Sequence, residues 1–208
     1  MRIGIDIDDT TVSTVKSMMK YGSIYNEEVL KRPPINFNLG EIKNRYYMTA
    51  LFGWSEEIKF DFFDKYYKQV LEDCEPLPGS PVVIRRLKEE GNTIYFISAR
   101  ITTIKGCNSE QISLDTFNKY GIPYDKVIIG AYDKLKYCLE HDIDVFIDDS
   151  LEVLEELSKH GIRCYLMTSP INSKLETGNV KRVTSWEEIY NDLQEVLNDP
   201  RKLKKELN

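Results

Sequence analysis

Three aspartates crowd directly behind the first apolar segment of the chain. Asp6, Asp8 and Asp9 follow the apolar residues 3–5. Alternate residues of an extended segment point the same way, so the carboxylates of Asp6 and Asp8 should project together beyond the end of a strand. A polar turn with a helix cap from Asp9 or Thr10 is the simpler interpretation. That interpretation does not explain three neighbouring carboxylates, whose mutual repulsion a cation would relieve.

A second acidic pair, Asp148 and Asp149, follows the apolar residues 145–147. The carboxyl ends of parallel strands meet at one edge of a sheet, where ligands bind in open α/β folds. Mg²⁺ prefers oxygen ligands and keeps some of its water, so two carboxylates and a backbone carbonyl are enough to hold it. Two acidic groups, each behind an apolar segment, therefore predict a magnesium site at that edge.

A hydroxyl and an ammonium lie between the two acidic groups. Ser98 ends an apolar segment, and Lys134 stands at the expected start of a helix. A transferring phosphoryl group needs such side chains, because its catalysis depends on positioning and on neutralising the equatorial oxygens. Taken singly, Ser98 could be a turn residue and Lys134 a surface lysine.

From residue 79 onward, short β-branched or aromatic segments alternate with helical patterns, which is typical of a parallel sheet flanked by helices. Glycines end several of the helices, and serines suit their N-caps. We predict an α/β, Rossmann-like fold with strands at 3–5, 93–98, 127–129, 145–147 and 163–168, and helices at 80–90, 109–120, 134 onward, 150–160 and 185–197.

The segment between the first strand and residue 78 contains helical patterns and aromatic residues but no convincing strand. Its best helix should start at Ser55, with an apolar stripe at helical spacing. Pro33, Pro34 and Gly79 interrupt the pattern on either side. We predict a helical cap at 15–76, inserted into a catalytic core formed by 1–14 and 77–208.

Composition limits the partners of the protein. The chain has 208 residues and a formal charge of −6, which argues against binding a nucleic acid polymer or an anionic membrane surface. Four widely spaced cysteines without a CxxC pair fit reduced thiols. No apolar run is long enough for a signal or a membrane span, so the expected location is the cytoplasm.

The motifs DIDDT at 6–10, ISAR at 97–100, Lys134 and IDDS at 147–150 resemble, in this order, the four motifs of the haloacid dehalogenase-like phosphohydrolases. The resemblance covers the chain apart from the insertion and the tail. It implies that Asp6 is a nucleophile that forms an aspartyl-phosphate, and that Asp8 is first the general acid and then the general base.

The resemblance also assigns the remaining roles. Mg²⁺ would be bound by Asp6, by the backbone carbonyl of Asp8 and by Asp149, with Asp148 as an outer partner. The phosphate would be held by Ser98, Ala99, Arg100 and Lys134.

Within that superfamily the chain most resembles the 5'(3')-deoxyribonucleotidases and their bacterial relatives, through DIDDT, KLKYCLEHDIDVFIDDS and VTSWEEI. The position after the DIDDT motif is often apolar in such phosphatases, whereas this chain has Thr11 there. This resemblance implies a small phosphomonoester substrate, a nucleoside monophosphate, and a monomer or homodimer. The base would need an aromatic slot, for which the cap offers Trp54 first, then Phe52 and Phe37, with Tyr46 and Tyr47 as further candidates.

Three alternatives stay open at this point. A phosphatase of the same mechanism could act on another small phosphoester. A phosphoacceptor signalling module resembling response-regulator receivers also uses aspartates, Mg²⁺, a hydroxyl and a lysine. Along the chain, however, such receivers place their acidic pair before the other motifs, whereas here the second acidic pair is the last motif. A catalytically silent binding protein would not need both Asp6 and Asp8.

Overall fold

A six-stranded parallel sheet forms the centre of the protein, which is represented by a computed structural model that describes residues 1–37, 39 and 47–198. The strand order is β3-β2-β1-β4-β5-β6, and each neighbouring pair is parallel. The strands are β1 (Arg2–Ile5), β2 (Thr93–Ser98), β3 (Lys126–Ile129), β4 (Val145–Asp148), β5 (Arg163–Met167) and β6 (Lys181–Val183). The predicted α/β fold is confirmed.

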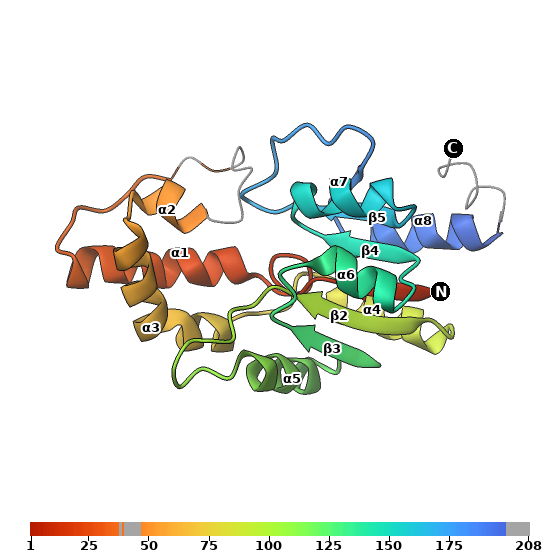
Figure 1. Cartoon of the computed structure of the whole chain (residues 1–208), viewed down its shortest axis with the longest axis horizontal. Coiled ribbons are helices and arrows are strands. Elements are labelled where there is room, and N and C mark those ends of the chain that lie inside the picture. The colour runs from red at the N-terminus through yellow and green to blue at the C-terminus, as the bar shows by residue number, and fades with distance from the viewer. Residues whose placement is uncertain (38, 40–46, 199–208) are drawn as a thin grey trace.

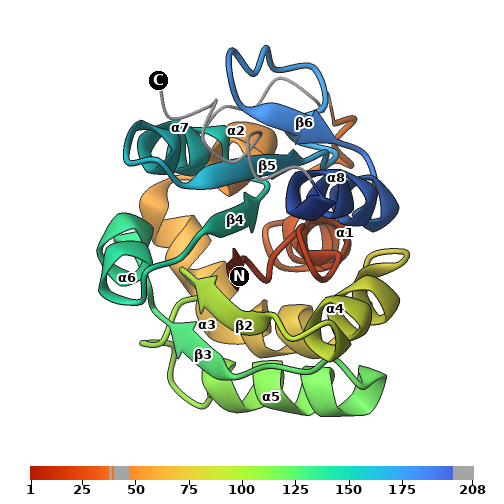
Figure 2. The same cartoon turned by 90° about the vertical axis from the view of Figure 1, so that its right-hand side faces the viewer.

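Helices cover both faces of this sheet, as Figure 2 shows. One face carries α4 (Ser80–Glu89), α5 (Ser109–Tyr120) and α8 (Trp186–Asn198), and the other carries α6 (Lys134–Glu140) and α7 (Leu151–Lys159). Neighbouring residues of β2 point to opposite faces. Phe96 packs in the apolar layer under α4, α5 and α8, and Ile97 packs in the layer under α6 and α7; both are fully buried. Burial on both sides explains why the strands appear as nearly continuous apolar runs.

Between β1 and α4 the chain forms helices that lie beyond the carboxyl ends of the strands (Figure 1). They include α1 (Thr14–Ile24), which continues as a π-helix η1 (Tyr25–Val29), then α2 (Tyr47–Phe52) and α3 (Glu56–Glu72). Ser55 is the N-cap of α3, as predicted, and its hydroxyl accepts a hydrogen bond from the Ile58 backbone N–H at 3.4 Å. These helices, together with Cys107 and Ile112 near the start of α5, bury a third apolar cluster, distinct from the two layers around the sheet.

The chain enters and leaves this helical segment at one place. The backbone N–H of Ser13 donates to the carbonyl of Glu75 at 2.8 Å, and that of Leu77 donates to the carbonyl of Thr11 at 2.9 Å. The two connecting segments therefore lie side by side next to the end of β1.

Three local features differ from the sequence prediction. Strand β6 was not predicted, because a three-residue edge strand with Lys181 and Arg182 has no apolar run. The N-cap of α4 is Gly79, with φ of 85°, rather than Ser80, whose hydroxyl instead donates to the carbonyl of Thr11 at 2.9 Å. Ser150 takes the N-cap position of α7 but makes no side-chain capping bond.

The four cysteines are buried and free, in line with the expected reduced thiols. In residues 1–37, 39 and 47–198, none of the helices combines the length and apolar character that a membrane crossing requires.

Candidate active site

Asp6 and Asp148 share one buried ammonium. Lys134, the first residue of α6, places its Nζ 2.6 Å from a carboxylate oxygen of Asp6 and 2.7 Å from one of Asp148. The remaining oxygen of Asp148 accepts a hydrogen bond from the Ser150 N–H at 2.9 Å. The central position of β1, between β2 and β4, brings these residues together from distant parts of the chain. The acidic residues that follow β1 and those at the end of β4 therefore meet at the carboxyl ends of the strands, as predicted.

Burial strongly affects the Asp6 carboxyl. It raises the pKa of Asp6 to about 7, against the lowering effect of Lys134, and the nearby Asp148 and Asp8 add to the rise. The pKa of Lys134 is itself raised, since the two carboxylates outweigh the effect of burial on the ammonium. The site therefore has one ammonium for two acidic side chains.

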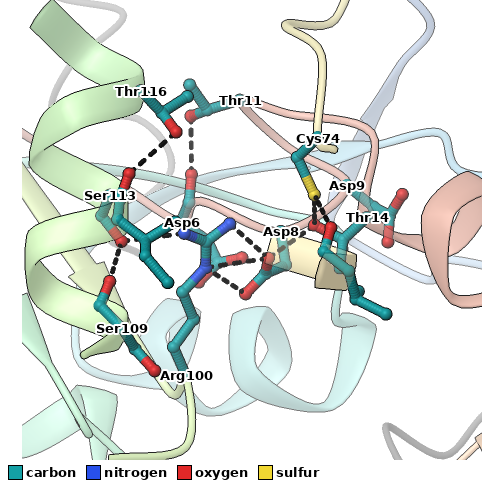
Figure 3. Close-up of polar contacts among 12 residues, drawn as sticks. Asp6, Asp8, Asp9, Thr11, Thr14, Cys74, Arg100, Ser109, Ser113 and Thr116 are labelled. Atoms are coloured by element: carbon teal, nitrogen blue, oxygen red, sulfur yellow. Dashed lines mark hydrogen bonds and ion pairs between the residues drawn. The ribbon is translucent and has the colours of Figure 1, made fainter. Parts of the chain in front are cut away.

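Asp8 is held by Arg100, as Figure 3 shows. The Arg100 Nε lies 3.0 and 3.1 Å from the two Asp8 oxygens, and its Nη2 lies 2.8 Å from one of them. The third nitrogen donates to Ser113 Oγ at 2.8 Å, and the Thr14 hydroxyl donates to Asp8 at 2.5 Å. Burial alone would raise the pKa of Asp8, but Arg100 and Thr14 hold that pKa below its ordinary value.

Asp9 caps α1. Both of its carboxylate oxygens accept the Val15 backbone N–H at 3.0 Å, and its own backbone has a φ of 50°. Burial raises the pKa of this carboxyl, and Asp8 and Asp6 add to the rise. The helix-cap interpretation therefore holds only in that the Asp9 carboxylate accepts a backbone N–H of the first turn of α1; Asp6 and Asp8 make different contacts.

Carboxylate oxygens of Asp6, Asp148 and Asp149 lie within 4.8 Å of one another. The Asp149 carboxylate accepts no hydrogen bond from the described part of the chain, and its pKa is raised by burial and by the nearby Asp9, Asp148 and Asp6. An oxygen donor set with uncompensated charge fits a hard divalent cation such as Mg²⁺. Asp8 does not join this group through its side chain, because that side chain faces Arg100.

A cavity of about 770 Å³ opens onto these groups. Its wall includes Asp6, Asp8, Asp149, Lys134 and Ser98. The Ser98 hydroxyl is buried and has no hydrogen-bond partner among the described residues, so a donor or acceptor is available for a ligand at the end of β2. Ala99 and Arg100 also line the cavity. All the predicted catalytic, metal-binding and phosphate-binding residues thus meet there.

The aromatic residues predicted to bind the base do not line this cavity. Trp54 and Phe52 are 4% exposed, stack on each other and pack in the core of the helical segment rather than along the cavity. The indole N–H of Trp54 donates to Asn26, and the Phe52 ring leaves no room for a side chain at Gly22. Phe37 lies against Phe52 in the same cluster.

The sequence prediction missed the residues that line the cavity from the other side. Met18 and Met48 contribute apolar surface, and α3 contributes a charged pair and three aromatic rings; these residues are Glu56, Lys59, Phe60, Phe63 and Tyr67. Tyr132, between β3 and α6, lies on the sheet side. Tyr46 lies outside the described residues, as does the side chain of Tyr47.

Asn172 was also missed. Its side-chain amide donates to the backbone carbonyls of Asp149 at 2.8 Å and of Met167 at 2.9 Å, while its oxygen accepts from Arg182 at 3.1 Å. The residue is 2% exposed and lines the cavity. It ties the loop after β5 to the backbone of a predicted metal ligand, and no spacing in the sequence indicates this contact.

Known proteins are similar to this chain along nearly its whole length. A putative nucleotidase of Bacillus cereus is 25% identical over 193 residues, which cover 91% of this chain and 96% of that protein. A putative 5'(3')-deoxyribonucleotidase of Chlorobaculum tepidum is 21% identical over 199 residues, covering 90% and 87% of the two chains. The solved structure of a haloacid dehalogenase-like hydrolase from Streptococcus pneumoniae has the same fold, with a TM-score of 0.66, 13% identity and coverage of 93% and 98%.

The sequence model of one family matches residues 1–197. That match takes in both acidic groups, Ser98, Lys134 and the intervening helices. The chain therefore belongs to the family described as 5' nucleotidase, deoxy (pyrimidine), cytosolic type C protein, and it is a haloacid dehalogenase-like phosphoric monoester hydrolase.

Proposed function

We propose that this protein hydrolyses deoxyribonucleoside monophosphates with Mg²⁺ through an aspartyl-phosphate on Asp6. The observation that carries the chemistry is the pair of aspartates beyond β1, of which Asp6 is bound to Lys134 and Asp8 to Arg100. Two carboxylates on the same cavity, held by different cations, are suited to two different roles.

In the first step an oxygen of Asp6 attacks phosphorus, and the bond from phosphorus to the ester oxygen breaks. The leaving oxygen takes a proton from Asp8, which must be protonated when the substrate is bound and must therefore first give up part of the contact with Arg100 that lowers its pKa. In the second step water attacks the phosphorus and loses a proton to the Asp8 carboxylate. The bond between phosphorus and Asp6 breaks, which releases phosphate and restores Asp6.

The side chains around Asp6 support this sequence of steps. Lys134 stabilises the ionised form of Asp6, which is the nucleophilic form, and Ser98 offers an unpartnered hydroxyl for a phosphoryl oxygen. Asp6, Asp149 and the Asp8 backbone carbonyl would hold Mg²⁺, with Asp148 behind them bound to Lys134. The cation would neutralise charge on the phosphoryl oxygens and on the carboxylates.

We also propose that residues 15–76 act as a cap over a core made of 1–14 and 77–208. The paired connections at Ser13–Glu75 and Thr11–Leu77 support this division. The cavity has walls from both parts, and its volume of about 770 Å³ is in the range of sites that enclose a small molecule. The cap would close the site against water during the reaction.

A nucleotide substrate is supported by the family match and by the aromatic surface on the cap side of the cavity. The second candidate, a phosphatase for another small phosphoester, has the same catalytic residues. A panel of deoxynucleoside, ribonucleoside and sugar monophosphates separates the two. Activity confined to the sugar phosphates would exclude the nucleotidase function and leave the phosphatase chemistry intact.

The location of the protein in the cytoplasm and its state as a monomer or homodimer stay predictions. Fractionation of cells and size-exclusion chromatography with light scattering test them directly.

A further inference from the structure

A buried threonine donates a hydrogen bond to the backbone of the proposed nucleophile. The Thr11 hydroxyl lies 2.8 Å from the backbone carbonyl oxygen of Asp6, and Figure 3 shows this contact. Thr11 is fully buried and is not among the described residues that line the cavity. Because this position is often apolar in such phosphatases, the fold alone does not require the hydroxyl.

Thr11 is itself held by its neighbours, so its hydroxyl is fixed in place. The backbone N–H of Thr11 donates to the carbonyl of Ile7 at 2.9 Å. The Thr11 carbonyl accepts from the backbone N–H of Leu77 and from the Ser80 hydroxyl, both at 2.9 Å. Every polar group of Thr11 is therefore hydrogen-bonded, and the residue joins the loop after β1 to the start of α4.

The contact with Thr11 fixes one of the two peptide groups that flank the Asp6 side chain. The other is fixed by the Asp6 N–H, which donates to the carbonyl of Ile147 on β4 at 2.9 Å. With both peptide groups held, the two soft backbone dihedrals of Asp6 are set, and so is the direction of its side chain. Lys134 then holds the carboxylate at 2.6 Å. The backbone and the lysine together determine where the nucleophilic oxygen lies.

The neighbouring Thr10 makes different contacts. It is also fully buried, but its hydroxyl has no hydrogen-bond partner among the described residues. Its carbonyl accepts from the indole N–H of Trp186 at 2.9 Å. Of these two adjacent threonines, it is Thr11 whose hydroxyl contacts the proposed nucleophile.

We propose that Thr11 is a positioning residue whose hydroxyl aligns the Asp6 carboxylate with the phosphorus. This inference rests on the proposed role of Asp6 as the nucleophile. In-line attack needs the reacting oxygen in a near-attack geometry, and a misplacement of about 1 Å can lower the rate by about 100-fold. Without the hydroxyl, the buried Asp6 carbonyl loses a donor, and its peptide group can turn toward another one. The carboxylate would then lie off the line of attack.

The test compares Thr11→Val and Thr11→Ser with the wild-type protein on dTMP and on p-nitrophenyl phosphate, which has no nucleoside. Valine has the shape of threonine but places a methyl group against the Asp6 carbonyl, whereas serine keeps the hydroxyl. Thr11→Val should lower kcat/KM by about 10- to 100-fold, because this ratio includes the attack by Asp6. Thr11→Ser should keep most of the wild-type value. Competitive inhibition by inorganic phosphate should be unchanged in both variants, since Thr11 is not part of the cavity wall.

Thr10→Val is the matched control. It removes a hydroxyl from the adjacent and equally buried threonine, without breaking a contact to Asp6. This variant should have a kcat/KM near that of the wild-type protein. Thermal melting checks that each variant is folded at the assay temperature. Thr11→Ala and Thr11→Ser differ by one oxygen atom, so they give the same comparison if valine prevents folding.

Two outcomes would overturn the inference, and Asp6→Asn tells them apart. Equal kcat/KM in folded Thr11→Ser and in the variants without the hydroxyl would show that the hydroxyl does not align Asp6. If Asp6→Asn is inactive in the same assay, the proposed function stands in that case. Turnover that survives Asp6→Asn would remove the proposed nucleophile, and this inference with it.

Discussion

Lys134 Nζ lies 2.6 Å from a carboxylate oxygen of Asp6 although 128 positions separate the two residues in the chain. The contact joins the end of β1 to the start of α6 across the carboxyl edge of the sheet. It places a fixed positive charge on the carboxylate that we propose as the nucleophile. The predictions about Asp6, Lys134 and Arg100 follow from the contacts between the charged side chains at the carboxyl ends of the strands.

Asp6→Asn should abolish turnover. An amide oxygen is a poor nucleophile toward phosphorus, so we expect kcat to fall by at least about a thousandfold. The measurement is phosphate release, with circular dichroism and thermal melting to check folding. Asp142→Asn is the control, because Asp142 is an exposed residue paired with Arg2 at the amino ends of β1 and β4, opposite the site. Undiminished turnover in a folded Asp6→Asn protein would rule out this nucleophile.

Lys134→Met should destabilise the protein as well as inactivate it. The substitution leaves Asp6 and Asp148 buried without their shared ammonium, which costs about 3 kcal/mol in the free energy of unfolding. Mg²⁺ should restore part of this loss, because a cation that binds only the folded carboxylates stabilises that state. Urea unfolding with and without Mg²⁺ gives both quantities. An equal Mg²⁺ effect on the wild-type and the variant would show that the cation does not compensate for the lysine.

The convergence of the two acidic groups could be predicted from sequence, because it depends on backbone properties. Asp6 and Asp149 each follow a short apolar segment, and parallel strands bring their carboxyl ends to the same edge. The helix from Ser55 and the insertion after the first strand were likewise indicated by periodicity and capping.

The side-chain partners could not be predicted in the same way. Arg100 was expected at the phosphate, but in the structure it lies between Asp8 and Ser113. Because Ser113 is on α5, this contact depends on how α5 packs against the sheet. The aromatic residues show the same limit. Trp54 and Phe60 are both apolar and both near the start of α3, yet the packing of α3 against α1 and α2 buries the first and exposes the second in the cavity.

Arg100→Met tests whether this residue positions Asp8 or binds the substrate phosphate. If Arg100 positions Asp8, the loss of three contacts misaligns the acid and base, and kcat should fall by about 10- to 100-fold with little change in KM. Arg100→Lys should give an intermediate kcat, because it keeps the charge but not the fork of donors. Ser113→Ala, which removes one support of the guanidinium, should have a smaller effect. A raised KM with unchanged kcat would instead assign Arg100 to the phosphate.

Asn172→Ala should weaken metal binding. The amide of Asn172 fixes the backbone at Asp149, and Arg182 holds the amide, so its loss lets a proposed metal ligand move. Supporting contacts of this kind change metal affinity by about 10- to 100-fold. Direct Mn²⁺ binding, measured by electron paramagnetic resonance, should show the weaker affinity, and high Mg²⁺ should recover much of the turnover. Asn191→Ala, at an exposed position on α8, is the control. Unchanged Mn²⁺ affinity in Asn172→Ala would contradict this role.

Asp192 should make the stability of the core depend on pH in the acid range. Burial would raise its pKa, but Lys181, the Tyr165 hydroxyl at 2.5 Å and Arg163 at 2.6 Å together lower it to about 2. Since the folded pKa lies below the ordinary value of 3.8, this contribution to stability is complete above about pH 4 and is lost as the pH falls toward 2. It amounts to at most about 2 kcal/mol.

Asp192→Asn removes that contribution. The variant should be less stable than the wild-type protein at pH 6, by up to about 2 kcal/mol, and the difference should shrink as the pH approaches 2. Urea unfolding across this pH range measures the effect. Because Asp192 joins α8 to β5 and β6 away from the cavity, turnover of the folded variant at neutral pH should stay near that of the wild-type protein. A stability difference that does not change between pH 6 and pH 2 would mean that packing, and not the charge of Asp192, stabilises this junction.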